Sequence, residues 1–366
     1  MQAVTKNYEK VQELMQSKVG RIYIGVDFHK ETSTLCITDF FGLEKDTVTV
    51  DTDKLMDYLA QYMGAEIAIE TTGGSNHMVA SLVAAGHKAT LVNTNKTKAI
   101  GLGGQKNDDK DAEVLTDLLR TDYLPKVHLK SLLSREVKTI LVQRKMLVQT
   151  RVSLICHVRG ILREFGVVIE VGPKNFYKFV AKAAKDITNE VIRRDLEENI
   201  EEIQRLKARE IAIAESLRVF CEQKHPEFFK KVERLETVPG IGPVTAMLMV
   251  AVMDDVTRFA DAQKWGSYLG LTPKEFSSGE MKKMGSITRS GCEMLRRYLI
   301  HGARSVMKTA QFKEQKSTVE NWAMKKKKKL GMNKATVALA HKIARIGFAV
   351  LRDDKGFSAV LIKKAA

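Results

Sequence analysis

The sequence predicts an α/β domain near the N-terminus, followed by a helical arm and a mainly helical C-terminal domain. Residues 21–125 alternate between short apolar runs with the period of strands and segments with the period of helices. Residues 130–230 keep the helical period almost throughout, and residues 231–366 place glycine- and proline-containing turns between apolar helices. With 366 residues, 44% of them hydrophobic, the chain can form two or three separate cores. We therefore divide it into an N-terminal extension (1–20), an α/β domain (21–129), a helical arm (130–230) and a C-terminal domain (231–366).

The first domain begins with three strands and then alternates helices and strands. The expected elements are strands at Arg21–Val26, Ser33–Thr38 and Thr47–Val50, a helix at Asp53–Tyr62, a strand at Ala65–Ile69, a helix at His77–Ala85, a strand at Lys88–Val92 and a helix at Asp108–Leu119. A glycine-rich loop, Gly101–Gly104, precedes the last helix. This order is typical of a ribonuclease H-like domain.

The arm consists of two apolar stripes with helical spacing, separated by Gly166–Lys185. One stripe runs from Val137 to Phe165, and the other runs from Ile192 to Phe220 with polar residues, Asn199 and Glu210, at two seam positions. Stripes spaced by four and three residues predict an antiparallel coiled-coil arm that mediates self-association, with the two polar residues setting the register. The alternative is ordinary packing in a helix bundle.

The C-terminal domain contains a predicted hairpin, a run of lysines and two predicted helices. Val238–Pro243 resembles the hairpin of a helix–hairpin–helix element, in which Gly240 and Gly242 expose backbone N–H groups to a DNA phosphate; the alternative is a plain turn between packed helices. The five lysines at Lys325–Lys329 are either a solvated tract or a nucleic-acid clamp. The other expected features are a turn-rich stretch at Leu271–Thr288, a helix at Cys292–Val306 and a helix at Lys334–Leu351 with Asn333 as its N-cap.

The charge of the chain is distributed unevenly. Residues 21–125 contain 10 Lys or Arg and 16 Asp or Glu, a balance of −6, whereas residues 126–366 carry +21 within a total of +16. A basic region of this size suits a polyanionic partner, because each neutralised phosphate releases counterions.

Other features narrow the class of protein. Four cysteines far apart in the sequence argue against a zinc site or disulfide framework, and the histidines show no ligand spacing. Neither a membrane helix nor a signal peptide is expected, and we expect a cytoplasmic protein that acts at the nucleoid.

Four acidic residues fall where this fold brings side chains together. Asp27 lies at the end of the first strand, and Glu70 lies at the end of a later strand that we expect to be its parallel neighbour. Asp108 and Asp111 lie one turn apart on one helix face. Hard divalent cations bind carboxylate oxygens, and two such ions about 4 Å apart stabilise both the attacking and the leaving oxygen in phosphoryl transfer. Each acid alone has an ordinary alternative: an aspartate after a strand often forms a turn, and Asp108 or Asp109 can be a helix N-cap.

The segments around these acids resemble a known family. They are Tyr23–Lys30 (YIGVDFHK), Ile69–Gly74 (IETTGG), Leu91–Asn93 (LVN) and Lys106–Ala112 (KNDDKDA). Together they resemble the DEDD transposases of the insertion-sequence one-ten family, which includes Piv-type pilin-gene invertases and bridge-RNA-guided recombinases. The family usually has Lys-Thr-Asp-x-x-Asp-Ala, and Asn107 replaces the threonine here. The resemblance implies a RuvC-like domain whose catalytic and metal-binding acids are Asp27, Glu70, Asp108 and Asp111, with Asp109 at a variable position.

The C-terminal domain carries the second part of the resemblance, through Leu269–Gly279, Gly285–Gly291 and Leu295–Leu299. In the family a serine in a Ser-Gly step is implicated as a nucleophile, which points to Ser278, with Ser277 as the alternative. Serine attack on a phosphodiester gives a covalent phosphoserine that conserves bond energy for rejoining. Without the resemblance, these residues form an ordinary turn. The cations expected to hold the phosphate are Lys274, Lys282, Lys283 and Arg289.

The sequence therefore predicts a DNA transposase or site-specific recombinase that uses Mg²⁺, with Mn²⁺ as a substitute, and a serine nucleophile. The resemblance also implies a structured guide RNA and a homo-oligomer, either a dimer or a tetramer, in which the acidic domain of one subunit meets the serine domain of another. One alternative is a Holliday-junction-type, structure-selective nuclease without serine chemistry. Another is a non-catalytic DNA-binding protein on a decayed nuclease fold, against which the intact set of acids argues. The target DNA, the guide RNA and the choice between transposition and inversion are left open.

Overall fold

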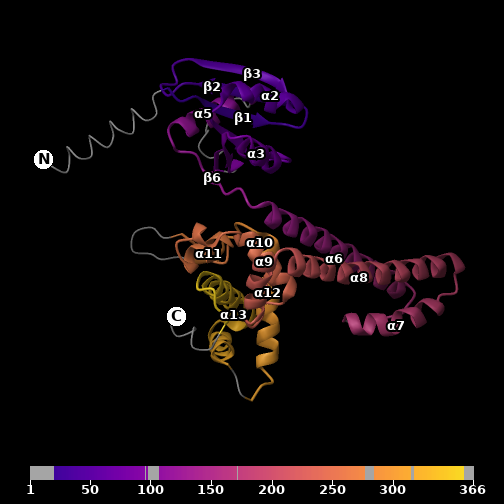
Figure 1. The fold of residues 1–366 in the computed structure, drawn as a ribbon. Helices are drawn as coiled ribbons and strands as arrows, with labels where there is room; N and C mark the ends of the chain where they lie inside the picture. Colours follow the sequence, from indigo (N-terminus) through magenta and orange to yellow (C-terminus); the bar gives the residue numbers. More distant parts are fainter. Residues whose placement is uncertain are drawn as a thin grey trace. The chain divides into compact units, whose positions relative to one another are not determined.

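The computed structural model describes residues 20–94, 96–97, 107–170, 172–276, 284–314 and 317–357. These residues belong to two compact units, which meet in the sequence between Lys130 and Ser131. Figure 1 shows that the first unit contains strands and helices, whereas the second is mostly helical. The prediction of an α/β region followed by helical regions is therefore confirmed.

A six-stranded sheet in the order β3-β2-β1-β4-β5-β6 forms the centre of the first unit (Figure 1). The elements are β1 (Tyr23–Phe28), β2 (Thr32–Thr38), β3 (Lys45–Asp51), η1 (Thr52–Lys54), α2 (Leu55–Leu59), η2 (Ala60–Tyr62), β4 (Glu66–Glu70), α3 (Ser75–Ala84), β5 (Lys88–Val92), α5 (Asp108–Arg120) and β6 (Lys126–Val127). β1 is antiparallel to β2 and parallel to β4, and β4 is parallel to β5. The predicted order of strands and helices is confirmed, and the short strand β6 adds to it.

The two faces of the sheet bury different side chains of β1, because successive residues of a strand point to opposite sides. Ile24 and Val26 belong to a core with α2 and α3, whereas Tyr23 packs in a second core with α5. Gly25 lies on the α5 side, where an added Cβ atom would be 2.4 Å from the carbonyl oxygen of Ala112. The helix thus rests directly on the strand backbone, and this close approach fixes where α5 begins relative to the end of β1.

The helical arm contains three helices: α6 (Leu132–Glu164), α7 (Pro173–Lys185) and α8 (Glu190–Lys224). The start of α6 shares a core with the end of α8, and the end of α6 shares another with the start of α8, so the two long helices are antiparallel. Gly166–Lys185 separates the two long helices as predicted, and it also contains α7, a helix that was not predicted. Pro173 supplies the first helical residue of α7, and Phe176 and Val180 of that helix are buried between the long helices.

The polar seam residues of the arm act differently from one another. Asn199 is half-buried and donates to the backbone carbonyl of Asp195 on its own helix, 2.8 Å away. Glu210 instead forms ion pairs across the seam with Arg144 and Arg151 of α6, both at 2.8 Å. Apolar seam residues such as Leu206 are buried within the chain itself. Packing inside one chain therefore accounts for the stripes, and self-association through the arm stays a prediction.

The rest of the second unit packs around an apolar central helix. Its elements are α9 (Pro226–Glu236), α10 (Pro243–Met253), η3 (Val256–Arg258), α11 (Ala262–Tyr268), β7 (Pro273–Glu275), β8 (Met284–Ile287), α12 (Glu293–Ala310) and α13 (Thr318–Arg352). Every residue from Ala246 to Met253 in α10 is buried. Within the described residues, none of the helices combines the length and the apolar composition required to span a membrane.

One predicted boundary in this unit was wrong. Asn333 does not start the last helix, because α13 already begins at Thr318, where Ser317 and Glu320 form a capping box. A kink at Gly331, whose φ is +75°, divides the helix, and the lysine run Lys325–Lys329 is helical. The stretch predicted to be rich in turns contains an antiparallel pair of strands, β7 and β8.

Candidate active site

Asp27 and Glu70 lie at the carboxyl ends of two neighbouring parallel strands. Val26 is paired with Ile69, so the two acids follow as the next pair along β1 and β4. Both lie on the face of the sheet that α5 covers, because they alternate with residues of the opposite core. The predicted parallel pairing of these strands is confirmed. Asp27 is the penultimate residue of β1, at the predicted end of the strand, and it pairs with Thr34 of β2.

The first turn of α5 carries Asp108, Asp109 and Asp111 above this end of the sheet. The alternative in which Asp108 or Asp109 caps the helix was wrong, because Asn107 is the N-cap and its side chain accepts a hydrogen bond from the backbone N–H of Asp109 (3.4 Å). Asparagine and threonine are both favoured N-caps, which explains why Asn107 can replace the threonine of the family motif. The positive end of the helix dipole stabilises acids in this turn.

Asp27, His29 and Asp108 form the closest group of side chains at this site. One ligand atom from each residue lies within 4.8 Å of the others. Nε2 of His29 is 3.1 Å from Oδ2 of Asp27 and 4.0 Å from Oδ1 of Asp108. The expectation that the histidines show no ligand spacing was therefore wrong for His29. The missed signal is Asp-x-His at the end of a strand, since residues two apart point to the same face.

Negative charge accumulates around the Asp27 carboxyl group. Asp27 is only 7% exposed, and burial raises the pKa of its carboxyl group. His29 opposes this rise in pKa, while the charges of Asp108 and Asp111 add to it. A divalent cation would offset the excess charge, and carboxylate oxygens are the ligands that hard cations prefer. The residues present thus fit a divalent metal, because carboxylate ligands suit Mg²⁺ and Mn²⁺.

The other two predicted acids lie outside this closest group. Glu70 is half-buried, and its Oε1 accepts a hydrogen bond from the hydroxyl of Thr97, 2.6 Å away. Thr97 was not predicted, because only its buried position beside β4 reveals the contact. Asp111 is half-buried and near enough to influence Asp27, whereas Asp109 is exposed.

The predicted residues of the C-terminal domain are placed only in part. Ser277, Ser278, Gly279, Lys282 and Lys283 lie outside the described residues. Lys274 in β7 and Arg289 after β8 are both exposed. Gly240 lies in a turn with φ +91°, and Gly242 is the N-cap of α10.

The fold and the acid cluster define a class of protein, an α/β protein with an acidic site suited to divalent cations at the edge of its sheet. A family model described as "Transposase" matches residues 24–167, and a model described as "Transposase IS116/IS110/IS902 family" matches residues 232–319. Together the two matches cover more than half of the chain. The chain belongs to the IS110 family of transposases.

Curated relatives include transposases of insertion sequences and a pilin gene-inverting protein. A transposase for insertion sequence element IS1111A from Coxiella burnetii is 29% identical over 335 residues, which are 90% of this chain and 89% of the relative. A transposase for insertion sequence element IS1328 from Yersinia enterocolitica is 24% identical over 345 residues, 92% of this chain and 98% of the relative. A pilin gene-inverting protein from Moraxella lacunata is 30% identical over 133 residues, 36% of this chain and 40% of the relative. Membership of a DEDD transposase family suggests a DNA-modifying enzyme that uses a divalent metal.

Proposed function

We propose that the protein cleaves and rejoins DNA strands with divalent metal bound to a ribonuclease H-like (RuvC-like) domain. The residues that hold Mg²⁺, or Mn²⁺ in its place, are Asp27, Glu70, Asp108 and Asp111. The observation that carries the proposal is the meeting of three elements at one edge of the sheet: the ends of β1 and β4 and the first turn of α5. When bound, the metal supplies positive charge to the oxygens of the reacting phosphate.

Two neighbouring side chains prepare the acids for this role. Thr97 donates to one oxygen of Glu70 and so orients the carboxylate while leaving its second oxygen free of this bond. His29 lies 3.1 Å from Asp27 and 4.0 Å from Asp108, so its imidazole lies beside the two acids that would hold the cation. Outer hydrogen bonds of this kind orient metal ligands in many sites.

The finer parts of the proposed chemistry rest on the family resemblance. Ser278 is proposed as the nucleophile: its Oγ bonds to phosphorus, the bond from phosphorus to the leaving oxygen breaks, and the departing strand end takes up the serine proton as a hydroxyl. A structured guide RNA and an oligomer belong to the same proposal. The basic balance of residues 126–366, +21, supports a nucleic-acid partner.

The test uses a plasmid that carries the gene with its native flanking DNA, with excision and joining measured by amplification across the new junctions. Asp27→Asn, Glu70→Gln, Asp108→Asn and Asp111→Asn should each abolish the junctions, because each change removes a ligand charge at nearly constant shape. Asp109→Asn is the matched control, one position away on the same helical turn, and should stay active. When Mn²⁺ is titrated into the purified proteins, the four acid variants should lose affinity for the metal and Asp109→Asn should keep it. An active Asp111→Asn protein beside an inactive Asp109→Asn protein would show that the wrong acids had been chosen.

A further inference from the structure

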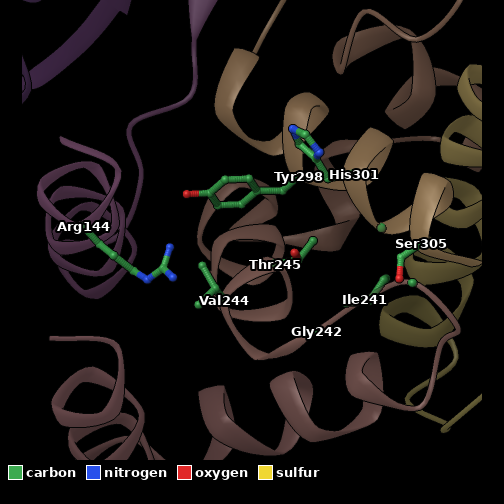
Figure 2. Close-up of a pocket in the computed structure, with 10 residues that line it drawn as sticks. Arg144, Ile241, Gly242, Val244, Thr245, Tyr298, His301 and Ser305 are labelled. Atoms are coloured by element: carbon green, nitrogen blue, oxygen red, sulfur yellow. The ribbon is translucent and has the colours of Figure 1, made fainter. Parts of the chain in front are cut away.

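A second concave site lies in the helical unit, between the arm and the C-terminal domain helices. The cavity has a volume of about 550 Å³ and is lined by residues of α6, α10, α12 and the turn before α10. Figure 2 shows Arg144 reaching from α6 toward α10, with Tyr298 and His301 of α12 across from it. Thr245 and Ser305 add hydroxyl groups, and none of the lining residues in the described part of the chain is acidic. Such a lining suits an anion.

The three glycines of this site differ in whether the fold requires them. A Cβ atom on Gly302 would lie 1.9 Å from the carbonyl oxygen of Gly240, so the close approach of α12 to the turn requires glycine there. Gly240 also has φ +91°, which favours glycine. Gly242 has φ −96°, and among the described residues a Cβ atom there would meet no atom within 4 Å. The fold does not need glycine at position 242, and its effect is to leave space at the start of α10.

The start of α10 offers hydrogen-bond donors to this space. No side chain in the described part of the chain caps the helix, and Pro243 at its first position has no N–H group. The N–H groups of Val244 and Thr245 in the first turn have no carbonyl partner within the helix. Both residues line the cavity. The helix dipole adds partial positive charge at the same point.

Arg144 supplies a full positive charge and is held in place. Its side chain is 19% exposed and is ion-paired at 2.8 Å with Glu210 of α8. Glu210 also binds Arg151 at 2.8 Å, so two guanidinium groups share one carboxylate and the cluster keeps a net positive charge. Only Arg144 of the two lines the cavity. A preorganised arginine binds a phosphate through directed hydrogen bonds.

We infer that this cavity binds one nucleotide unit of a nucleic-acid strand, with the phosphate between the α10 N-terminus and Arg144. The sugar and base lie against Ile241, Val244 and the ring of Tyr298, which give the cavity an apolar wall that a bare anion does not need. The volume falls within the usual range for organic ligands, roughly 300–1,000 Å³, and exceeds what one phosphate fills. The inference deepens the proposed function, since it rests on nucleic acid as the partner.

The test measures binding of end-labelled duplex DNA, single-stranded DNA and RNA of one sequence to the full-length protein by fluorescence anisotropy, over a range of salt. Arg144→Gln should weaken binding roughly tenfold and lower the slope of log affinity against log salt by about 1, as for one lost phosphate contact. Arg151→Gln is the matched control, because it removes a partner of Glu210 but no lining cation. The nucleic acid whose affinity falls most in Arg144→Gln is the one that occupies the cavity.

Gly242→Ala tests the same site without touching a charge. Its Cβ atom enters free space, so thermal stability should be kept while affinity falls. Gly160→Ala is the control, since a Cβ atom at Gly160 also meets nothing within 4 Å and Gly160 lies outside this cavity. Wild-type affinity in both Gly242→Ala and Arg144→Gln would overturn the inference, as would equal losses in Arg144→Gln and Arg151→Gln. Inorganic phosphate is then added as a competitor. If it displaces duplex DNA, single-stranded DNA and RNA equally well, the cavity is a site for free phosphate only. If the wild-type protein binds none of the strands, the proposed function fails too; if it binds and these variants match it, only the cavity inference fails.

Discussion

Replacement of Gly25 by alanine should disable the acid cluster without removing any acid. The added Cβ atom would lie 2.4 Å from the carbonyl oxygen of Ala112, 2.5 Å from Oγ1 of Thr116 and 2.6 Å from its backbone nitrogen. Two of these three atoms belong to the α5 backbone and cannot rotate away. To reach 3.4 Å, where ordinary contact begins, α5 has to retreat by about 1 Å from β1. The hydrogen bond from the Gly25 N–H to Thr116 Oγ1, now 2.9 Å, lengthens with it.

Gly25→Ala should reduce Mn²⁺ affinity and junction formation more than it reduces the free energy of unfolding. Overpacking of this kind costs roughly 1–3 kcal/mol, which a chain of this size tolerates. A displacement of about 1 Å at a reacting centre, however, can reduce the rate by roughly 100-fold. Asp108 moves with α5 while Asp27 stays with the sheet, so Mn²⁺ affinity and junction formation should both fall steeply. Calorimetric titration of Mn²⁺ and thermal unfolding measure the two effects in the same sample.

Two control variants separate movement of the helix from loss of stability. Ile67→Val and Leu82→Ala remove buried methyl groups from the opposite core, at roughly 0.5–1.5 and 2–5 kcal/mol. They bracket the expected cost of Gly25→Ala but leave α5 seated, so both should keep wild-type Mn²⁺ affinity. A Gly25→Ala protein that binds Mn²⁺ as tightly as the wild type would refute the idea that helix seating aligns the acids.

Three further predictions concern other parts of the chain. Ser278→Ala should eliminate junctions and any covalent protein–DNA adduct detected on denaturing gels while DNA binding persists, and Ser277→Ala should be milder. Leu206→Lys should reduce helix content in circular dichroism, because its side chain is buried within the chain; a fully folded monomer would instead place Leu206 at an interface between subunits. Burial, with a contribution from Arg345, lowers the pKa of His341 below its ordinary value of about 6.5, so the unfolded chain binds the extra proton. Urea unfolding should therefore show stability falling as pH drops below about 6.5, less steeply in His341→Gln, and identical pH profiles would rule this out.

The sequence was sufficient for features that depend on nearby residues. Strand periodicity placed β1, β4 and β5, and two strands that each carry an acid at their carboxyl end predicted the neighbouring positions of Asp27 and Glu70. The i and i+3 spacing of Asp108 and Asp111 predicted their common turn. These relations follow from the geometry of one strand pair or one helix, so no tertiary information was required.

Features that depend on packing distance were missed. The contact of His29 with Asp27 and Asp108 requires α5 to lie directly on Gly25, which no pattern within the strand reveals. Thr97 reaches Glu70 from beyond β5, so its role depends on the path of the chain after that strand. α7 was missed because its four apolar core positions are interleaved with lysines, and its helix shows mainly through burial against α6 and α8.

Glu210 shows how a residue that interrupts a pattern can carry the most structural information. In the sequence, Glu210 interrupts the apolar stripe of its helix, and the pattern alone predicts only that it sets the register of the two helices. In the fold its carboxylate is 13% exposed and pairs with two arginines of the opposite helix. A carboxylate this buried is costly unless it is paired, so any shift of α8 along α6 by one turn would leave charges without partners. The same pairing points one of those arginines into the cavity beside α10. The register of the arm and the position of the cavity's only arginine, among the described residues, are therefore set by one side chain.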